Sequence, residues 1–228
     1  MNTRTLAVIA ALGIAPVVSA QKAPDLAPYL TANRDDEVAL ARTAAPSKVS
    51  GSATVLVLTP KGYVEAAHGT NGFTCLVMRS FAGEPTDPAF WNPHTVAPVC
   101  FNPPAARTVL QSSLTKMQWA IAGATPAQMK ERTDMAYADK RFPMPAAGAM
   151  AYMLSPRQHL SDDGDPHWMP HLMFYYDGSL STAAFGAGDD SAPIVGGDGA
   201  SKVHVQLIYI PVRAWSDGTP AIHGTDGK

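Results

Sequence analysis

The order of strand-like and helix-like segments predicts an α+β fold. Strand and hairpin signals come first, a pair of helices follows in mid-chain, and further strands come last. Segregated runs of strands and helices are typical of α+β domains. We therefore expect a mainly antiparallel sheet of about five or six strands, with a mid-chain helical hairpin, an N-terminal helix, and the helices covering one face.

The N-terminal helix lies in residues 21–50, which we otherwise interpret as a linker. Asn33 or Thr31 can cap a helix that runs to Arg42. Residues 35–37 are all acidic and fall in its first turn, where the helix dipole favours negative charge. Pro46 then ends the helix.

The strand segments are rich in β-branched and aromatic residues and are bounded by turn signals. The first segment, 53–59, leads through Pro60-Lys61-Gly62 into a returning strand at 63–67. Asn71-Gly72 marks the next turn, because this pair tolerates positive φ. The remaining strands are expected at 73–79, 150–154, 171–176 and 203–212.

The two mid-chain helices share one start signal, a capping residue followed by proline. Asn102 and Thr125 are the caps, and proline suits the first turn because its missing N–H needs no partner there. We expect these helices to run to about residues 122 and 141. The Pro-rich segment 80–99, the Gly/Asp/Ser-rich segment 177–201 and the tail 213–228 are interpreted as loops.

The first 20 residues have the features of a secretory signal. Arg4 is followed by an apolar run at 6–15, and small residues precede a cleavage point after Ala20. The run is too short to span a bilayer, which takes about 20 residues, and no later stretch approaches that length. We expect a signal at 1–20, a linker and helix at 21–50, and a single α+β domain at 51–228. The protein would be exported and soluble, periplasmic or extracellular, without a membrane span.

Two cysteines, Cys75 and Cys100, follow the signal. In an oxidising compartment an isolated pair favours a disulfide. The alternative, a metal or redox pair, would more typically be C-x-x-C. Closing a loop of this length would stabilise the fold by about 3.5 kcal/mol in the chain-entropy account.

Composition excludes some partner classes. The net charge is −2, and no cluster of five basic residues occurs, so the footprint needed to neutralise phosphates is missing. We therefore expect no nucleic-acid partner and no binding to anionic membrane surfaces. At 46% hydrophobic residues the chain is too apolar to be wholly disordered, and its 18 glycines and 20 prolines indicate many turns.

The densest group of metal-ligating side chains lies between residues 162 and 176. His167, Met169, His171 and Met173 alternate, so in an extended chain all four would point the same way. Imidazole with thioether suits copper, Cu(I) above all. The alternative is a strand that enters the core with His171 at its mouth, because Pro170 interrupts any extended run. The acidic residues Asp162, Asp163 and Asp165 would attract a cation and raise the pKa of His171.

Trp91, Asn92 and His94 lie in the Pro-rich segment between the cysteines. If the disulfide forms, this loop is held at both ends and these three residues can line a small-ligand cleft. The alternative is that Trp91 folds back into the core.

Familiar catalytic signatures are missing from the sequence. G-x-S-x-G, G-x-G-x-x-G and the Walker A pattern do not occur. A zinc site would need three or four ligands, which His167 and His171 could complete only with distant residues such as His68, His94 or Glu65.

Several strings together resemble an uncharacterised family of exported bacterial proteins. The resemblance implies a single exported domain and carries no activity, cofactor or catalytic residue with it. The strings are TNGFTCLV (70–77), WNPH (91–94), APVCFNP (97–103), PHLMFYY (170–176) and WSDGTPA (215–221).

Three classes of function remain. The favoured one is an exported non-catalytic domain that binds a small molecule or a protein partner. The second is a periplasmic copper or zinc protein centred on His171, with copper as the possible cofactor. The third is a hydrolase of unrecognised type that uses some of His68, His94, His171 and Glu65, so whether the protein is an enzyme stays open.

Overall fold

The structure, a computed structural model, describes residues 24–178, 186, 194–196 and 204–221. The secretory signal predicted at 1–20 lies outside the described residues, as does most of the loop expected at 177–201. Within the described part of the chain, no helix has the length and apolar character needed to cross a membrane.

An eight-stranded sheet forms the centre of the described chain, in the order β2-β1-β3-β4-β5-β6-β8-β7. It is a mixed sheet: β1 and β3 pair in parallel, and the other neighbours are antiparallel. The strands are β1 Thr54–Thr59, β2 Gly62–Ala67, β3 Thr74–Met78, β4 Ala97–Phe101, β5 Met150–Met153, β6 His171–Asp177, β7 Ile194–Gly196 and β8 Val205–Pro211.

The strand count exceeds the five or six expected from the sequence, because β4 and β7 form in segments interpreted as loops. In β4 the misleading residue is Pro98, which has no N–H to donate to a sheet. It is tolerated because β5 pairs with β4 only through Cys100 and Phe101, so Pro98 lies outside that paired stretch.

Local capping explains where the main helices begin. The Asn33 side chain accepts from the backbone N–H of Asp35, and Thr125 forms a reciprocal capping box with Gln128. The first mid-chain helix is broken at Thr108, where φ is −119° and ψ is −84°. The helices are α1 Arg34–Arg42, α2 Ser47–Ser50, α3 Pro103–Arg107, α4 Val109–Ile121 and α5 Pro126–Ala138, with 3-10 turns η1 Ala27–Tyr29 and η2 Ser80–Ala82.

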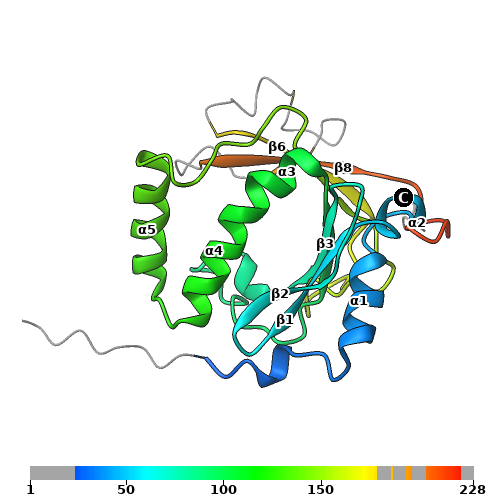
Figure 1. Cartoon of the computed structure of the whole chain (residues 1–228), viewed down its shortest axis with the longest axis horizontal. Coiled ribbons are helices and arrows are strands. Elements are labelled where there is room, and N and C mark those ends of the chain that lie inside the picture. The colour runs from blue at the N-terminus through cyan, green and yellow to red at the C-terminus, as the bar shows by residue number, and fades with distance from the viewer. Residues whose placement is uncertain (1–23, 179–185, 187–193, 197–203, 222–228) are drawn as a thin grey trace, which may run out of the picture.

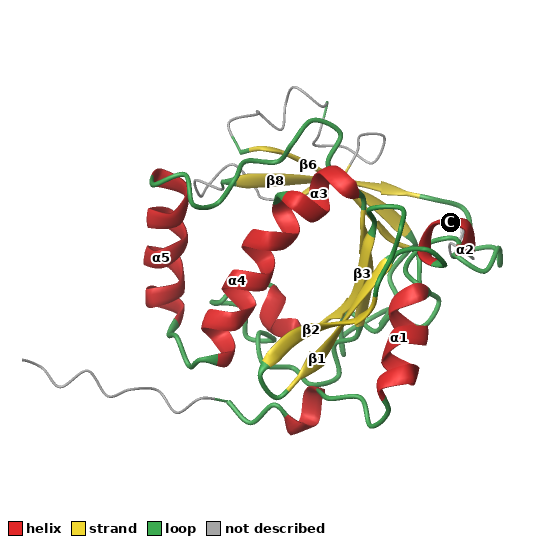
Figure 2. Ribbon diagram, viewed as in Figure 1, coloured by secondary structure: helices red, strands yellow, loops and turns green. Residues whose placement is uncertain are grey.

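Helices cover both faces of the sheet, not one face as expected. Figures 1 and 2 show α4 and α5 on one side of β1 and β3 and α1 on the other. The physical reason lies in the central strands: β4 is buried at every position and β3 at its three central ones. Strands that are apolar on both faces need cover on both sides.

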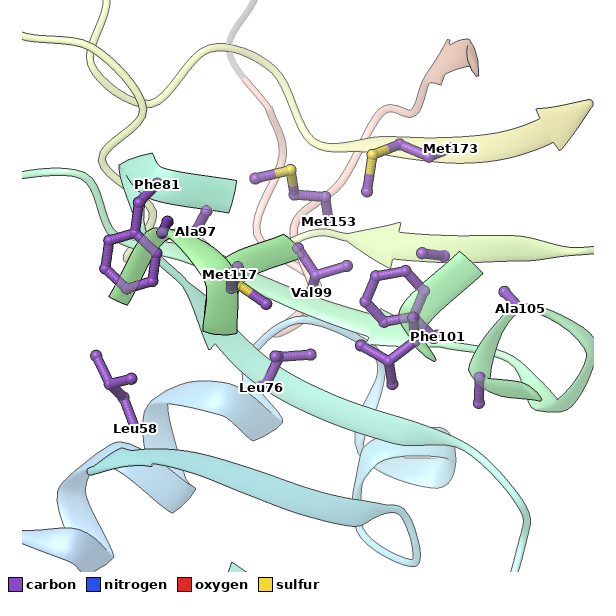
Figure 3. Close-up of a cluster of buried hydrophobic side chains, with 14 of the residues drawn as sticks. Leu58, Leu76, Phe81, Ala97, Val99, Phe101, Ala105, Met117, Met153 and Met173 are labelled. Atoms are coloured by element: carbon purple, nitrogen blue, oxygen red, sulfur yellow. The ribbon is translucent and has the colours of Figure 1, made fainter. Parts of the chain in front are cut away.

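Two hydrophobic clusters fill these two layers. The larger lies between the sheet and α3–α5; Figure 3 shows Leu76 and Val99 of the central strands near Met117 of α4. Leu26 and Tyr29, from the segment expected as a linker, are also buried in this cluster. The smaller cluster lies under α1 and contains both cysteines.

The disulfide between Cys75 and Cys100 is confirmed. The two residues are register partners on β3 and β4, with Cα atoms 3.9 Å apart, and both are fully buried. The bond therefore joins two adjacent central strands beneath α1.

A buried ion pair also fastens α1 to the sheet. Glu37 and Arg79 are 2% and 4% exposed, and Arg79 Nη2 lies 2.8 Å from Glu37 Oε2. The backbone N–H of Leu58 donates to Glu37 Oε1 at 3.3 Å, and Thr31 Oγ1 donates to Glu37 Oε2. Glu37 lies in the first turn of α1 as expected, and it is in addition a buried partner of Arg79.

Candidate functional site

His171 is the first residue of β6, and it is 1% exposed. Side chains alternate along this strand, so His171, Met173 and Tyr175 share its buried face. The imidazole therefore points into the main core at one end of the sheet, and does not sit at an open mouth.

The hydrogen bonding of His171 fixes its tautomer. Its Nδ1 lies 2.8 Å from the carbonyl oxygen of Met169. A carbonyl only accepts, so Nδ1 carries the proton and Nε2 of the neutral ring holds a lone pair. That Nε2 is buried and has no hydrogen-bond partner among the described residues.

Burial lowers the pKa of His171, and the bond to Met169 opposes that effect only in part. The expectation that residues 162–165 would raise this pKa is wrong. Asp162, Asp163 and Asp165 are exposed to solvent, whereas the imidazole is enclosed by apolar groups, so desolvation dominates. His171 is therefore a neutral base at neutral pH.

Two aromatic rings pack against the imidazole. The ring centroids of Trp168 and Tyr209 lie 4.4 and 5.5 Å from that of His171, and 5.6 Å from each other. Trp168 is half-buried, so it connects the enclosed imidazole to the surface. Its φ of 47° is in the left-handed region, which bulky residues rarely adopt. Residues with such a backbone conformation are often found at ligand sites.

The left-handed turn at Trp168 also separates the four residues of the predicted metal site. His171 and Met173 lie on β6, whereas His167 and Met169 precede it in a segment that is not a strand. His167 is exposed, and its Nδ1 lies 3.8 Å from Asp165 Oδ1. The structure thus places His171 and Met173 on one face of β6, whereas the strand does not include His167 and Met169.

The β5–β6 register brings another methionine to His171. Met153 of β5 is the direct partner of His171, and Ala151 is the partner of Met173. Directly opposite residues share a face, with Cβ atoms about 4.5–5.5 Å apart. Figure 3 shows the Met153 and Met173 side chains in the same hydrophobic cluster. Sequence reasoning missed Met153, because the register of two strands separated by an irregular segment cannot be read from one sequence.

Gln158 also contacts the segment that precedes β6. Its Nε2 donates to the carbonyl oxygen of His167, and its own Oε1 is buried without a hydrogen-bond partner among the described residues. Gln158 and His171 each use one polar atom to hold segment 167–169 and leave the other unpaired. This end of the sheet therefore has two buried polar atoms without a hydrogen-bond partner, both next to the same segment.

A second, exposed group of side chains converges on Asp162. His159 Nε2 lies 2.8 Å from Oδ1, Asn92 Nδ2 donates to Oδ2 at 2.8 Å, and His94 Nδ1 lies 3.1 Å from Oδ2. These contacts lower the pKa of Asp162, His159 making the largest contribution. They join the Pro-rich loop to the segment after β5.

The three residues expected to line a cleft in the Pro-rich loop separate into two environments. The Trp91 ring packs against Tyr29, Phe81 and Phe90 and belongs to the core margin. Asn92 and His94 instead face Asp162. Trp91 therefore packs back against the core, which is the alternative to a place in a cleft.

The residues considered for a hydrolase or a zinc site do not converge. His68 Nδ1 pairs with Glu65 Oε1 at 3.1 Å on the exposed β2 end, and four strands separate β2 from β6. Across the described part of the chain, no group of three or more His, Cys, Asp or Glu side chains could hold a metal ion. A site at His171 must therefore draw on other donor types.

Comparison with known proteins adds no relative. No protein-family model matches the chain, and no match is found among curated proteins or among solved structures.

Proposed function

We propose that this chain is an exported, non-catalytic protein that binds a small ligand through Nε2 of His171. The observation that carries the proposal is the unprotonated nitrogen of a 1% exposed residue with no partner in the described structure. An unmet buried polar atom costs about 1–3 kcal/mol. A ligand that takes up this lone pair recovers that free energy, so the site favours a bound state.

The surroundings of His171 restrict what the ligand can be. Trp168 and Tyr209 contact the imidazole, and Met153 and Met173 are its neighbours on the sheet. A small ligand with an apolar or polarisable surface, which offers one electron-pair acceptor or hydrogen-bond donor, suits this lining. Trp168 and Tyr209 are both half-buried, so this lining reaches the surface through them.

A binding role suits the site better than catalysis. Nδ1 of His171 bonds to a backbone carbonyl, whereas a general base in a hydrolytic triad is oriented by a carboxylate. Among the described contacts of His171 there is no serine, threonine or cysteine side chain to act as a nucleophile. The disulfide agrees with the exported location proposed from the signal at 1–20.

The test compares wild type with His171→Leu in thermal unfolding. Without ligand we expect Tm to change by no more than about 4 °C. Removing the unmet Nε2 and losing the bond to Met169 offset each other, each being about 1–3 kcal/mol. For a chain of this size 1 kcal/mol corresponds to about 2–4 °C.

The ligand arm of the test uses a panel of Cu(I), Ag(I), Zn(II), phenol and indole. We expect at least one member to raise the Tm of wild type, as mass action requires of a ligand bound to the native state, and to leave His171→Leu unchanged. Equal shifts in both proteins, no shift with any member, or a drop of more than about 8 °C in ligand-free His171→Leu would contradict the proposal.

A further inference from the structure

We infer that the ligand of this site is a soft monovalent metal ion, Cu(I), held by His171 Nε2 together with the thioethers of Met153 and Met173. The inference rests on the proposed binding function of His171 and names the class of ligand. It differs from the set expected from the sequence, because Met153 enters and His167 and Met169 leave.

The sheet register places these three residues together. Met153 lies directly opposite His171, and Met173 lies two residues further along β6 on the same face. Neighbours of this kind have Cβ atoms about 4.5–5.5 Å apart across the strands and up to about 7–8 Å on the diagonal. Both methionines are buried in the main core, and Figure 3 shows their side chains on the same side of the sheet. An unbranched methionine has three rotatable bonds with which to bring its sulfur to a shared ion.

The donor set is neutral, and this determines the charge of the ion. One imidazole and two thioethers bring no negative charge, so the site cannot offset the desolvation of a divalent cation. Thioether sulfur selects Cu(I), whereas structural Zn(II) takes four ligands from thiolate, imidazole and carboxylate. Both cysteines are in the disulfide, so thioethers are the soft donors left in the described chain. Because Nε2 is already unprotonated, the ion displaces no proton from it.

The aromatic residues complete the enclosure. Trp168 and Tyr209 contact His171 and lie in T-shaped contact with each other, so ring surfaces border the enclosed imidazole. Aromatic faces attract a cation at distances up to about 6 Å. A metal ion bound here therefore lies near the indole of Trp168 and quenches its fluorescence.

The test is an anaerobic titration of the full exported chain with Cu(I), in the presence of ascorbate and a competing bicinchoninate chelator. We expect one equivalent to bind to wild type. Met153→Leu and Met173→Leu should each weaken binding at least tenfold, and His171→Leu should abolish it. Methionine and leucine have similar volumes, so these changes preserve packing. Met129→Leu, at a buried methionine on α5, is the matched control and should bind as wild type does.

A second measurement does not depend on variants that fold. X-ray absorption of the Cu(I)-loaded selenomethionine protein should show two selenium neighbours and one nitrogen at the copper. Fluorescence quenching on loading should disappear in Trp168→Phe.

The outcomes separate this inference from the proposed function. If Cu(I) binding needs His171 but is unchanged in both methionine variants, or copper lacks selenium neighbours, the thioether site is wrong and His171 remains the ligand-binding residue. If wild type binds phenol or indole through His171 and no Cu(I), the inference is likewise overturned. If His171→Leu binds Cu(I) as wild type does, the inference fails, and a Tm panel without His171-dependent shifts would overturn the proposed function as well.

Discussion

His171 and Asp162 differ in how many of their polar atoms have hydrogen-bond partners. His171 keeps one nitrogen free, whereas Asp162 accepts from three side chains although it is 49% exposed. The two lie on either side of segment 163–170, one buried and one at the surface. The Asp162 group therefore joins the loops around the candidate site, and the proposed ligand chemistry lies at His171.

The Asp162 contacts predict a change in its pKa when they are removed. In wild type we expect that pKa to lie below the ordinary 3.8, and to rise toward it in both His159→Leu and His94→Leu, because both histidines lower it. Carbonyl-carbon NMR of Asp162 across an acid titration measures both. The stabilisation from Asp162 is present above its unfolded pKa and is lost as the pH falls through the folded value. An Asp162 pKa that stays at its wild-type value in either variant would show that this contact is wrongly assigned.

Elements are fastened to the sheet by different means on its two faces. On the face with the larger hydrophobic cluster, α4 packs by hydrophobic contact. On the opposite face, α1 has apolar contacts and also the buried ion pair of Glu37 and Arg79. Removing one partner of a buried ion pair leaves the other charge uncompensated, which is far more costly than losing a surface pair. Glu37 therefore anchors α1 rather than merely favouring its first turn.

This difference gives a matched pair of variants. Glu37→Ala should lower the free energy of unfolding by about 3–5 kcal/mol, because Arg79 stays buried without its carboxylate. Lys130→Ala, which breaks the exposed pair with Asp134 on α5, should cost no more than about 0.5 kcal/mol. Urea unfolding of the two proteins measures both values. A Glu37→Ala protein within 1 kcal/mol of wild type would mean that the ion pair does not anchor α1.

At the scale of the whole molecule, local signals were readable from the sequence and long-range ones were not. The caps at Asn33, Asn102 and Thr125 each lie beside the residues they serve, so the starts of three helices were predicted correctly. The disulfide followed from the cysteine count and the expected compartment. By contrast, β4 was hidden by Pro98, because its tolerance depends on where β5 pairs.

The candidate site shows the same division. His171 and Met173 stand out in the sequence by their spacing, which the strand period preserves. Met153 comes to them through the β5–β6 register, and Trp168 through a left-handed backbone turn. Neither the register nor the turn has a local sequence signal here. The burial of His171, which reverses the expected direction of its pKa shift, likewise depends on the packing of the whole sheet.

The most direct test of the account is the protonation state of His171, measured by long-range ¹H–¹⁵N correlation NMR of the ligand-free protein at pH 7. We expect a neutral ring with its proton on Nδ1 and an unprotonated Nε2, because the Met169 carbonyl can only accept and burial lowers the pKa of the imidazole. A proton on Nε2, or an imidazolium at this pH, would contradict the account, because neither form leaves a lone pair on Nε2 for a ligand.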